Sequence, residues 1–323
     1  MAREVAVPAE WELRAERRRY GPLRVLLALR HHPLGVFGLV VIFVLVVTAI
    51  GAPLIAPYDP ETAPSQTKVL QPPTLDHVFG TDRLGRDVFS RVVFGARLTL
   101  EVGLVSVLFG VFGATALGLA SGYLGGRVDS IIQRTVDVAL AFPALILLLA
   151  IMSVLGNPDS GPRQFVIDHT PLSESKNINI GILTVAIGIG MMAGVTRIVR
   201  GAVLSEKQNV YVEAARALGA TDLRIMAGHV LPNIMALIIV LVSILLPVAI
   251  LAEASLSFLG LGVPPPAPSW GADLSAARSW LEEAPWWTIF PGTAISLTVL
   301  GFNLLGDALR DILDPRLRGR GLS

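Results

Sequence analysis

Six stretches of the chain, each about 20 to 25 residues long, contain no Asp, Glu, Lys, Arg or His. Crossing the hydrocarbon core of a bilayer takes about 20 mostly apolar residues in a helix, because each residue rises about 1.5 Å and the backbone finds no water there. Only 16% of the 323 residues are charged, against about 25% in soluble domains. We therefore predict an all-α membrane protein with six transmembrane helices, at 34–57, 102–126, 138–158, 177–196, 230–252 and 284–306.

The prolines of the chain predict bends in two of these spans and a loop outside them. Pro143 and Pro247 fall inside the third and fifth predicted helices, where proline produces a bend or a gate, and we favour the bend. A further uncharged stretch, 254–271, contains four prolines and is interpreted as a loop or re-entrant segment.

Small residues recur every four positions on the second and fourth helices, which predicts close helix packing. They are Ser106, Gly110, Ala114, Gly118 and Gly122 on the second, and Ala186, Gly190 and Gly194 on the fourth.

Basic residues outside the spans predict how the chain is oriented. Arg and Lys gather before the first span, between the fourth and fifth spans, and after the sixth. An even number of spans places these three segments on one side, and the positive-inside rule makes that side cytoplasmic, with both termini there. The loop between the first and second spans disagrees, since it carries five basic residues, but the five acidic residues at 59–87 balance them. We keep this loop outside and expect 87–97 to form an interfacial helix leading into the second span.

Several classes of function are disfavoured by what the spans lack. Ion-coupled carriers and proton pumps commonly place ionisable groups at mid-membrane, whereas Arg134, Asp137 and Glu253 here lie at span edges. There is no HExxH sequence and no histidine within a span, which disfavours an intramembrane protease. None of the three lysines stands in a phosphate-binding P-loop, so any ATP is bound by another polypeptide. The absence of cysteine and a net charge of +1 exclude thiolate sites and a nucleic-acid partner.

The segment between the fourth and fifth spans, 209–229, has the sequence NVYVEAARALGATDLRIMAGH. Its alanine-rich first part predicts a helix that ends at Gly219, and Thr221 or Asp222 can cap a second helix. By itself this pattern also fits an ordinary surface hairpin of two helices. The more specific spacing is Glu213-Ala214-Ala215, then Gly219 after three residues, then Leu231-Pro232 twelve residues later. It resembles the EAA loop of permease subunits in bacterial binding-protein-dependent ABC importers, with His229 where the general pattern often has isoleucine.

Three longer stretches narrow the resemblance. They are GTDRLGRDVFSRVVFGAR at 80–97, EASLSFLGLGVPPPAPSWG at 253–271 and PWWTIFPGTAISLTVLGFNLLGDALRDILDPR at 285–316. Together they are similar to the DppC/OppC branch of these permeases, which transports dipeptides, oligopeptides and, in some members, nickel. The resemblance covers about 34–318 and implies the type I ABC importer permease architecture.

In this family the EAA loop forms a coupling helix that sits in a groove of the ATPase subunit. Carried over to this sequence, the resemblance implies a contact made by Glu213, Ala214, Ala215 and Gly219, with Leu231 and Pro232 opening the fifth span. Together with the predicted spans, this loop divides the chain into four parts. These are a cytoplasmic N-terminal arm (1–33), a first helix with its outer loop (34–97), a five-helix permease core (98–310) with a coupling loop at 201–229, and a cytoplasmic tail (311–323).

For function, the resemblance implies a non-catalytic subunit in the bacterial cell membrane. Its partners would be a second, DppB/OppB-like permease, two ABC ATPases that bind ATP and Mg²⁺, and an extracytoplasmic peptide-binding protein. The chain itself would bind no cofactor and no metal. We favour di- and oligopeptides as cargo, because the spans hold no histidine or carboxylate cluster for nickel. The alternatives are an importer of nickel or another small solute, and an ion-coupled secondary transporter.

For each of two groups of residues near the predicted outer ends of the spans, the sequence allows two roles. The tryptophans are interpreted as an aromatic belt at the membrane interface, with contact to the binding protein as the alternative. They are Trp270, Trp280, Trp286 and Trp287. The charged group fits either local salt bridges or contact with the binding protein. It consists of Asp82, Arg83, Arg86 and Asp87.

Overall fold

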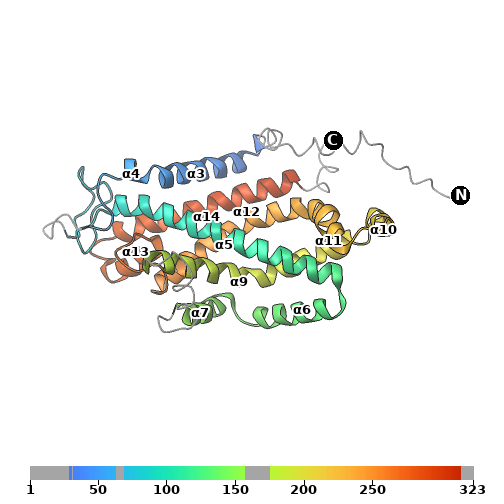
Figure 1. Cartoon of the computed structure of the whole chain (residues 1–323). Helices are drawn as coiled ribbons and strands as arrows, with labels where there is room; N and C mark the ends of the chain where they lie inside the picture. Colours follow the sequence, from blue (N-terminus) through green and yellow to red (C-terminus); the bar gives the residue numbers. More distant parts are fainter. Residues whose placement is uncertain (1–28, 31, 63–68, 157–174, 314–323) are drawn as a thin grey trace.

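The computed structural model describes residues 29–30, 32–62, 69–156 and 175–313; most of the predicted arm and the tail beyond 313 lie outside these ranges. Apart from one isolated bridge between Thr81 and Asp87, the regular structure of the described residues is helical, and the long helices run side by side (Figure 1). The helices are α3 (Pro33–Ile50), α4 (Ala52–Ile55), α5 (Val88–Leu124), α6 (Gly126–Leu140), α7 (Ala144–Leu155), α9 (Ser175–Glu206), α10 (Val210–Ala217), α11 (Asp222–Ile225), α12 (Leu231–Phe258), α13 (Trp270–Ala277) and α14 (Trp286–Leu313). A π-helical turn (Met226–Val230) precedes α12, and a 3-10 turn (Arg278–Trp280) follows α13.

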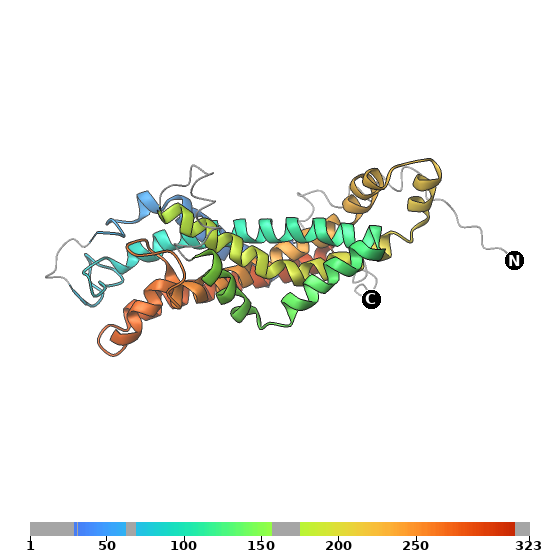
Figure 2. The ribbon, with the colours of Figure 1, turned by 60° about the horizontal axis from the view of Figure 1, so that its bottom comes forward.

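Five of the six predicted spans correspond to helices that are long and apolar enough to cross a membrane: α3, α5, α9, α14 and a helix that runs from α11 through α12. The third predicted span, 138–158, is wrong as a single helix. The chain bends by 101° between α6 and α7, and Figure 2 shows the V that they form. Pro143 stands at this break with a ψ of 135°. Its ring removes a backbone donor and disfavours a helical conformation at Phe142, so the bend becomes a break. Pro247 lies within α12 without ending it.

The helix α5 joins two segments that we predicted one after the other. Residues 87–97, expected as an interfacial helix leading into the second span, correspond to the first turns of one continuous helix that starts at Val88. Asp87 caps it, its Oδ2 accepting hydrogen bonds from the backbone N–H of Ser90 at 2.8 Å and from the Ser90 hydroxyl at 2.7 Å. Arg91 is buried, and its Nη2 donates to Asp273 Oδ1 at 2.6 Å. Because the Arg91 charge is paired inside the protein, the helix continues past this residue.

The close packing predicted for the second span occurs between α5 and α9. All five residues of the small-residue stripe on α5 are buried. A Cβ atom added at Gly110 would lie 2.8 Å from the carbonyl oxygen of Gly188, and one added at Gly118 would lie 2.7 Å from the Cβ of Val199. The two backbones can therefore approach this closely only because side chains are missing. The prediction for α9 is wrong at Gly194, where an added Cβ would meet nothing within 4 Å.

An ion pair and a hydrogen bond hold together the charged loop before α5. Arg86 Nε donates to Asp82 Oδ2 at 2.7 Å, and His77 Nδ1 lies 2.9 Å from Asp87 Oδ1. All four side chains are buried. Local pairing therefore accounts for Asp82, Arg86 and Asp87, and of the four charged residues singled out from the sequence Arg83 is the exposed one.

The prediction of an aromatic belt is wrong for two of the four tryptophans. Trp270 and Trp287 are buried inside the protein, with 2% and 0% of their surface exposed. The Nε1–H of Trp270 donates to the carbonyl of Val92 at 2.8 Å, which fixes α13 against α5. The proline-rich stretch does contain a loop, which begins after α12 ends at Phe258.

Candidate functional site

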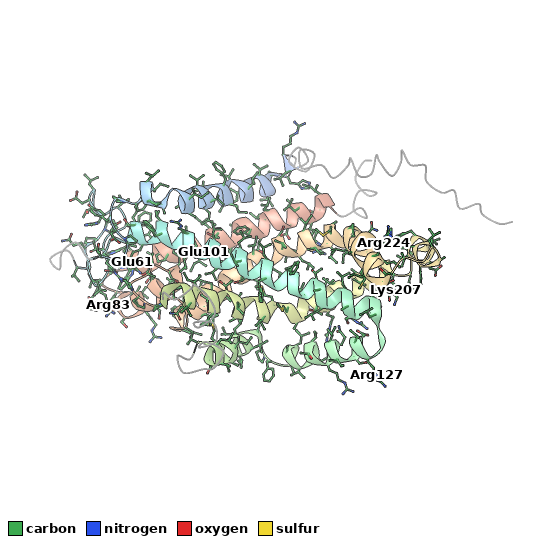
Figure 3. The ribbon with its side chains drawn as sticks, in the orientation of Figure 1. Glu61, Arg83, Glu101, Arg127, Lys207 and Arg224 are labelled. Atoms are coloured by element: carbon green, nitrogen blue, oxygen red, sulfur yellow. The ribbon has the colours of Figure 1, made fainter. Side chains whose placement is uncertain are left out.

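Two short helices, α10 and α11, extend beyond the ends of the long helices (Figures 1 and 2). They lie at the end of the molecule where α3 begins and α14 ends. This agrees with the prediction that the first span starts, and the last span ends, on the side of the loop 201–229. Figure 3 labels Lys207 and Arg224 in this region.

The helix α10 carries the predicted contact residues. Glu213 and Ala214 are exposed, and Ala215 is partly buried. Val212, which the motif does not single out, is fully buried and belongs to the main apolar core. An eight-residue helix is not stable alone in water, so burial of Val212 holds α10 on the rest of the protein. The outward face presents small side chains beside one carboxylate, that of Glu213.

The first short helix ends at Gly219, as predicted. Its φ of +81° lies in the left-handed region that favours glycine. Two backbone hydrogen bonds close the turn, from Ala220 N–H to Ala215 O at 3.1 Å and from Gly219 N–H to Arg216 O at 2.9 Å. This is the Schellman pattern of a helix C-terminus. The angle between α10 and α11 is therefore fixed by the backbone itself.

The second short helix leads directly into the membrane. Thr221 caps α11, and the π-helical turn then joins it to α12, which starts at Leu231 with Pro232 in its first turn. The sequence placed the start of the fifth span at the same two residues. The helical run is nevertheless longer, covering Asp222–Phe258. Pro232 has no N–H to donate to the preceding turn, and the wider π turn accommodates it. The helix α11 is thus a continuous extension of a membrane helix.

Tyr123, at the C-terminal end of α5, joins the loop to the other membrane helices. It is 2% exposed. Its hydroxyl accepts a hydrogen bond from Arg216 of α10 and donates one to Asp222 of α11, both at 3.1 Å. Its carbonyl accepts from Lys207 Nζ, and the Lys207 and Arg216 cations lie 5.2 Å and 5.8 Å from the ring centre, within the range of cation–π attraction. One residue thus contacts α10, α11 and the residue that follows α9.

A second tyrosine fixes α10 to two further helices. The Tyr211 hydroxyl donates to the Glu206 carboxylate at the end of α9 and accepts from Asn233 Nδ2 of α12 at 3.0 Å. Partial burial and the neighbouring Glu206 carboxylate raise the pKa of Tyr211, so its phenol remains a donor at neutral pH. Asn233 also donates to the His229 carbonyl at 2.8 Å. The loop is therefore held from both sides.

A polar network just inside this end links α5, α6 and α9. Arg200 donates to both carboxylate oxygens of Asp129, from Nε at 2.6 Å and from Nη2 at 2.7 Å. This bidentate geometry is the strong form of an ion pair. Ser121 Oγ donates to the same carboxylate at 2.5 Å, and Gln133 Nε2 donates to Ser121 Oγ at 2.9 Å.

Sequence reasoning identified α10 and Gly219 but missed Tyr123, Lys207 and Tyr211. Tyr123 and its partner Arg216 are 93 residues apart, and no local pattern marks such a pair. Only two weak signals were available, the position of Tyr123 in the chain and the rarity of lysine. Tyr123 is the last buried residue before the Gly125 turn that ends α5, and Lys207 is one of three lysines in the chain.

Two family models match this chain. Residues 114–319, more than half of the chain, match the binding-protein-dependent transport system inner membrane component. Residues 23–73 match the N-terminal transmembrane domain of oligopeptide transport permease C. The first match contains the whole of the α10–α11 loop.

Named relatives cover most of the chain. The dipeptide transport system permease protein DppC of Alkalihalophilus pseudofirmus is 41% identical over 291 residues, which are 90% of this chain and 88% of the relative. The glutathione transport system permease protein GsiD of Pectobacterium atrosepticum is 42% identical over 290 residues, 90% of this chain and 89% of the relative. The resemblance carried by the EAA loop is thereby confirmed. The chain belongs to the binding-protein-dependent permeases of ABC importers, in the DppC/OppC branch, and is a multi-pass protein of the bacterial plasma membrane.

Proposed function

We propose that this chain is the permease subunit of an ATP-driven importer for di- and oligopeptides. It pairs with a second, related permease to enclose the translocation path. Two ATPases, which bind ATP and Mg²⁺, lie on the cytoplasmic side, and one of them docks on α10 and α11 of this chain. An extracytoplasmic binding protein delivers the peptide at the opposite end. Membership of the permease family supports this assembly, and the names of the dipeptide and glutathione permeases support a small peptide as cargo.

The observation that carries the proposal is the continuity between the loop and the membrane helices. The helix α11 passes through the π turn into α12, and Tyr123 ties both short helices to α5. A displacement of α10 therefore reaches α5 and α12 as a rigid-body tilt, because no flexible joint absorbs it. Closure of the ATPase dimer would switch the path between outward and inward access in this way, with Glu213, Ala214, Ala215 and Gly219 at the contact.

The test uses the complete importer in liposomes, with Glu213→Lys and Gly219→Val. The first variant removes the carboxylate available to a basic group of the ATPase. The second places a β-branched residue at a φ of +81°, which costs about 1–2 kcal/mol. We expect each variant to lower binding-protein-stimulated ATP hydrolysis and peptide uptake about tenfold or more, the effect of losing about 1.4 kcal/mol of coupling.

Matched controls separate coupling from folding. Asp311→Lys reverses an exposed charge in the last turn of α14, and Gly201→Ala changes an exposed glycine of α9 where an added Cβ meets nothing within 4 Å. Both controls should keep wild-type ATPase stimulation and uptake. Wild-type behaviour of the Glu213 and Gly219 variants would overturn the coupling role.

The energy source and the cargo are tested on the wild-type importer. Uptake should stop when ATP is depleted and should continue when ionophores remove ion gradients, whereas an ion-coupled carrier would respond in the opposite way. Unlabelled di- and tripeptides should compete with a labelled peptide, and Ni²⁺ should not. Uptake of Ni²⁺ without uptake of peptides would replace the proposed cargo.

A further inference from the structure

A cavity of about 810 Å³ opens between the first turns of α5, the segment that follows α4 and the beginning of α9. Its lining includes three acidic residues, Asp59, Glu61 and Glu101, and the basic Arg97. Figure 3 shows Glu61 and Glu101 in the half of the molecule away from Lys207. The cavity thus lies far from the loop that docks the ATPases, and its lining has an excess of negative charge.

Arg97 and Glu101 face this cavity without partners. They stand one helical turn apart on α5 and are exposed, and neither side chain is bonded to any residue within the described ranges. Arg91, two turns earlier on the same helix, is by contrast buried and paired with Asp273. Two unpaired groups of opposite charge beside one cavity suit a ligand that carries both charges.

A groove continues from the cavity along α5 and α9. A second hollow of about 380 Å³ shares Glu101 and Ile180 with the first and is lined further on by Val105, Phe109 and Thr184. Val105 and Phe109 are 48% and 42% exposed, so the chain itself does not cover this face. An ionisable side chain on a membrane helix is costly against lipid and normally faces a water-filled path or a partner. Glu101 lies where the cavity and the second hollow meet.

We propose that Arg97 and Glu101 bind the two charged ends of a short peptide as it enters the translocation path. This inference rests on the proposed peptide import and names the residues that select the cargo at the entrance. The Glu101 carboxylate binds the α-ammonium group of the peptide. The Arg97 guanidinium binds its α-carboxylate in the bidentate geometry that arginine favours. The other acidic residues of the cavity make its potential negative, which attracts the ammonium end.

The spacing of the two groups fits a dipeptide. Side chains four residues apart on a helix have Cβ atoms about 5–6 Å apart. An extended peptide spans about 3.3–3.6 Å per residue, so the ends of a dipeptide are about 7 Å apart. Both side chains can therefore hold one dipeptide at once, whereas a longer extended peptide engages one of them at a time.

The first experiment compares a defined mixture of free dipeptides with the N-acetylated and C-amidated forms of the same peptides. Uptake is measured in liposomes containing the complete importer, and the affinity of the binding protein for each form is measured by calorimetry. We expect Glu101→Gln to raise the KM for free dipeptides about tenfold, as for one charge-assisted hydrogen bond. It should also abolish the preference for free over N-acetylated peptides. Arg97→Gln should abolish the preference over C-amidated peptides, and Glu101→Asp should retain part of the first preference.

The second experiment does not depend on how the binding protein treats blocked peptides. The chain contains no cysteine, so Glu101→Cys introduces a single thiol for a small methanethiosulfonate reagent. In the presence of the binding protein, free dipeptides should slow the labelling about tenfold, because a bound peptide covers the site. Glu283→Cys replaces an exposed glutamate outside the cavity and should be labelled at one rate with and without peptide.

The outcomes distinguish a failure of this binding site from a failure of the proposed function. Absence of ATP-dependent peptide uptake by the wild-type importer would remove the proposed function itself. With wild-type import present, the site is overturned if Glu101→Gln keeps the preference for a free amine, or if dipeptides do not protect the introduced thiol. Failure of the Glu101→Gln chain to assemble with its partners would also overturn it, since it would assign Glu101 to a subunit interface.

Discussion

Tyr123 places one phenolic hydroxyl between the two short helices of the loop. Arg216 donates to this hydroxyl, which in turn donates to Asp222, while the ring lies beside the Lys207 and Arg216 cations. A hydroxyl between a cation and a carboxylate is polarised from both sides, which strengthens both hydrogen bonds. Removal of this hydroxyl should therefore loosen the loop while the ring still fills its site.

We predict that Tyr123→Phe uncouples ATP hydrolysis from uptake. The two charge-assisted hydrogen bonds are lost, whereas ring packing and cation–π contact remain. The ratio of peptide imported to ATP hydrolysed, measured in liposomes, should fall several-fold while the importer still assembles. Ser130→Ala is the control, because the Ser130 hydroxyl bonds only to the Gly126 carbonyl of its own helix. An unchanged ratio in Tyr123→Phe would limit the hydroxyl to a local role.

Two ion pairs between α6 and α9 should differ in strength. Arg200–Asp129 is bidentate, with side chains 30% and 22% exposed, whereas Arg197–Asp137 has side chains 52% and 62% exposed. Solvent and side-chain entropy leave most exposed pairs with about 0–1 kcal/mol. Double-mutant cycles with alanine, followed by thermal unfolding in detergent, should give the first pair a coupling energy of about 1–2 kcal/mol. The second pair should give no measurable coupling, and equal values would contradict the ranking.

At the scale of elements, the contact between α5 and α9 depends on side chains that are absent. A methyl group at Gly110 would meet the carbonyl oxygen of Gly188 at 2.8 Å, and a backbone atom cannot rotate away. We predict that Gly110→Ala destabilises the protein by about 1–3 kcal/mol. Gly194→Ala meets no atom within 4 Å and should be neutral or stabilising by up to about 1 kcal/mol, because alanine favours a helix. Unfolding of both variants in detergent checks this, and equal losses would contradict the packing argument.

The sequence predicts an element well where a single local property of the chain determines that element. Apolar length locates five spans, and the need for a positive φ at Gly219 locates the end of α10. The sequence predicted a helix at 87–97 but not that it forms one helix with the second span. The search for spans excluded charged residues, whereas Arg91 is paired with Asp273, 182 residues away. At Pro143 a local rule predicts an interruption of the helix, but it does not give the size of the angle, which is 101°. A distant partner, absent from any local pattern, thus decided the result at Arg91.

The candidate site also has one part that the local sequence predicts and one part that it does not. The α10 helix and its glycine turn are encoded within a dozen residues, so the sequence located them. The tyrosines that hold the loop depend on contacts between helices that are distant in the sequence. The balanced charges of the outer loop also did not reveal which were paired: the structure joins Arg86 to Asp82 and leaves Arg97 and Glu101 open to the cavity.

At the scale of the whole molecule, charged side chains lie at both ends. Lys207 and Arg224 lie at the end with α10 and α11, and Figure 3 places Glu61, Arg83 and Glu101 in the other half. The chain returns from the end of α5 toward the opposite end through α6 and α7 (Figure 2). Arg30 lies just before α3, which begins at the end of the molecule that carries the α10–α11 loop. The positive-inside rule predicts that this side is cytoplasmic.

We predict this orientation for three variants of the cysteine-free chain. Leu218, which is 88% exposed beside Gly219, and the exposed Arg30 mark one end, and Glu283 marks the other. A membrane-impermeant maleimide added to intact spheroplasts should label Glu283→Cys, and should label Leu218→Cys and Arg30→Cys only after permeabilisation. Opposite labelling of Leu218→Cys and Arg30→Cys would mean that α6 and α7 do not complete a crossing. Labelling of Leu218→Cys alone in intact spheroplasts would place α10 outside, where no ATPase can reach it, and the coupling role and the peptide entrance at Glu101 would fail together.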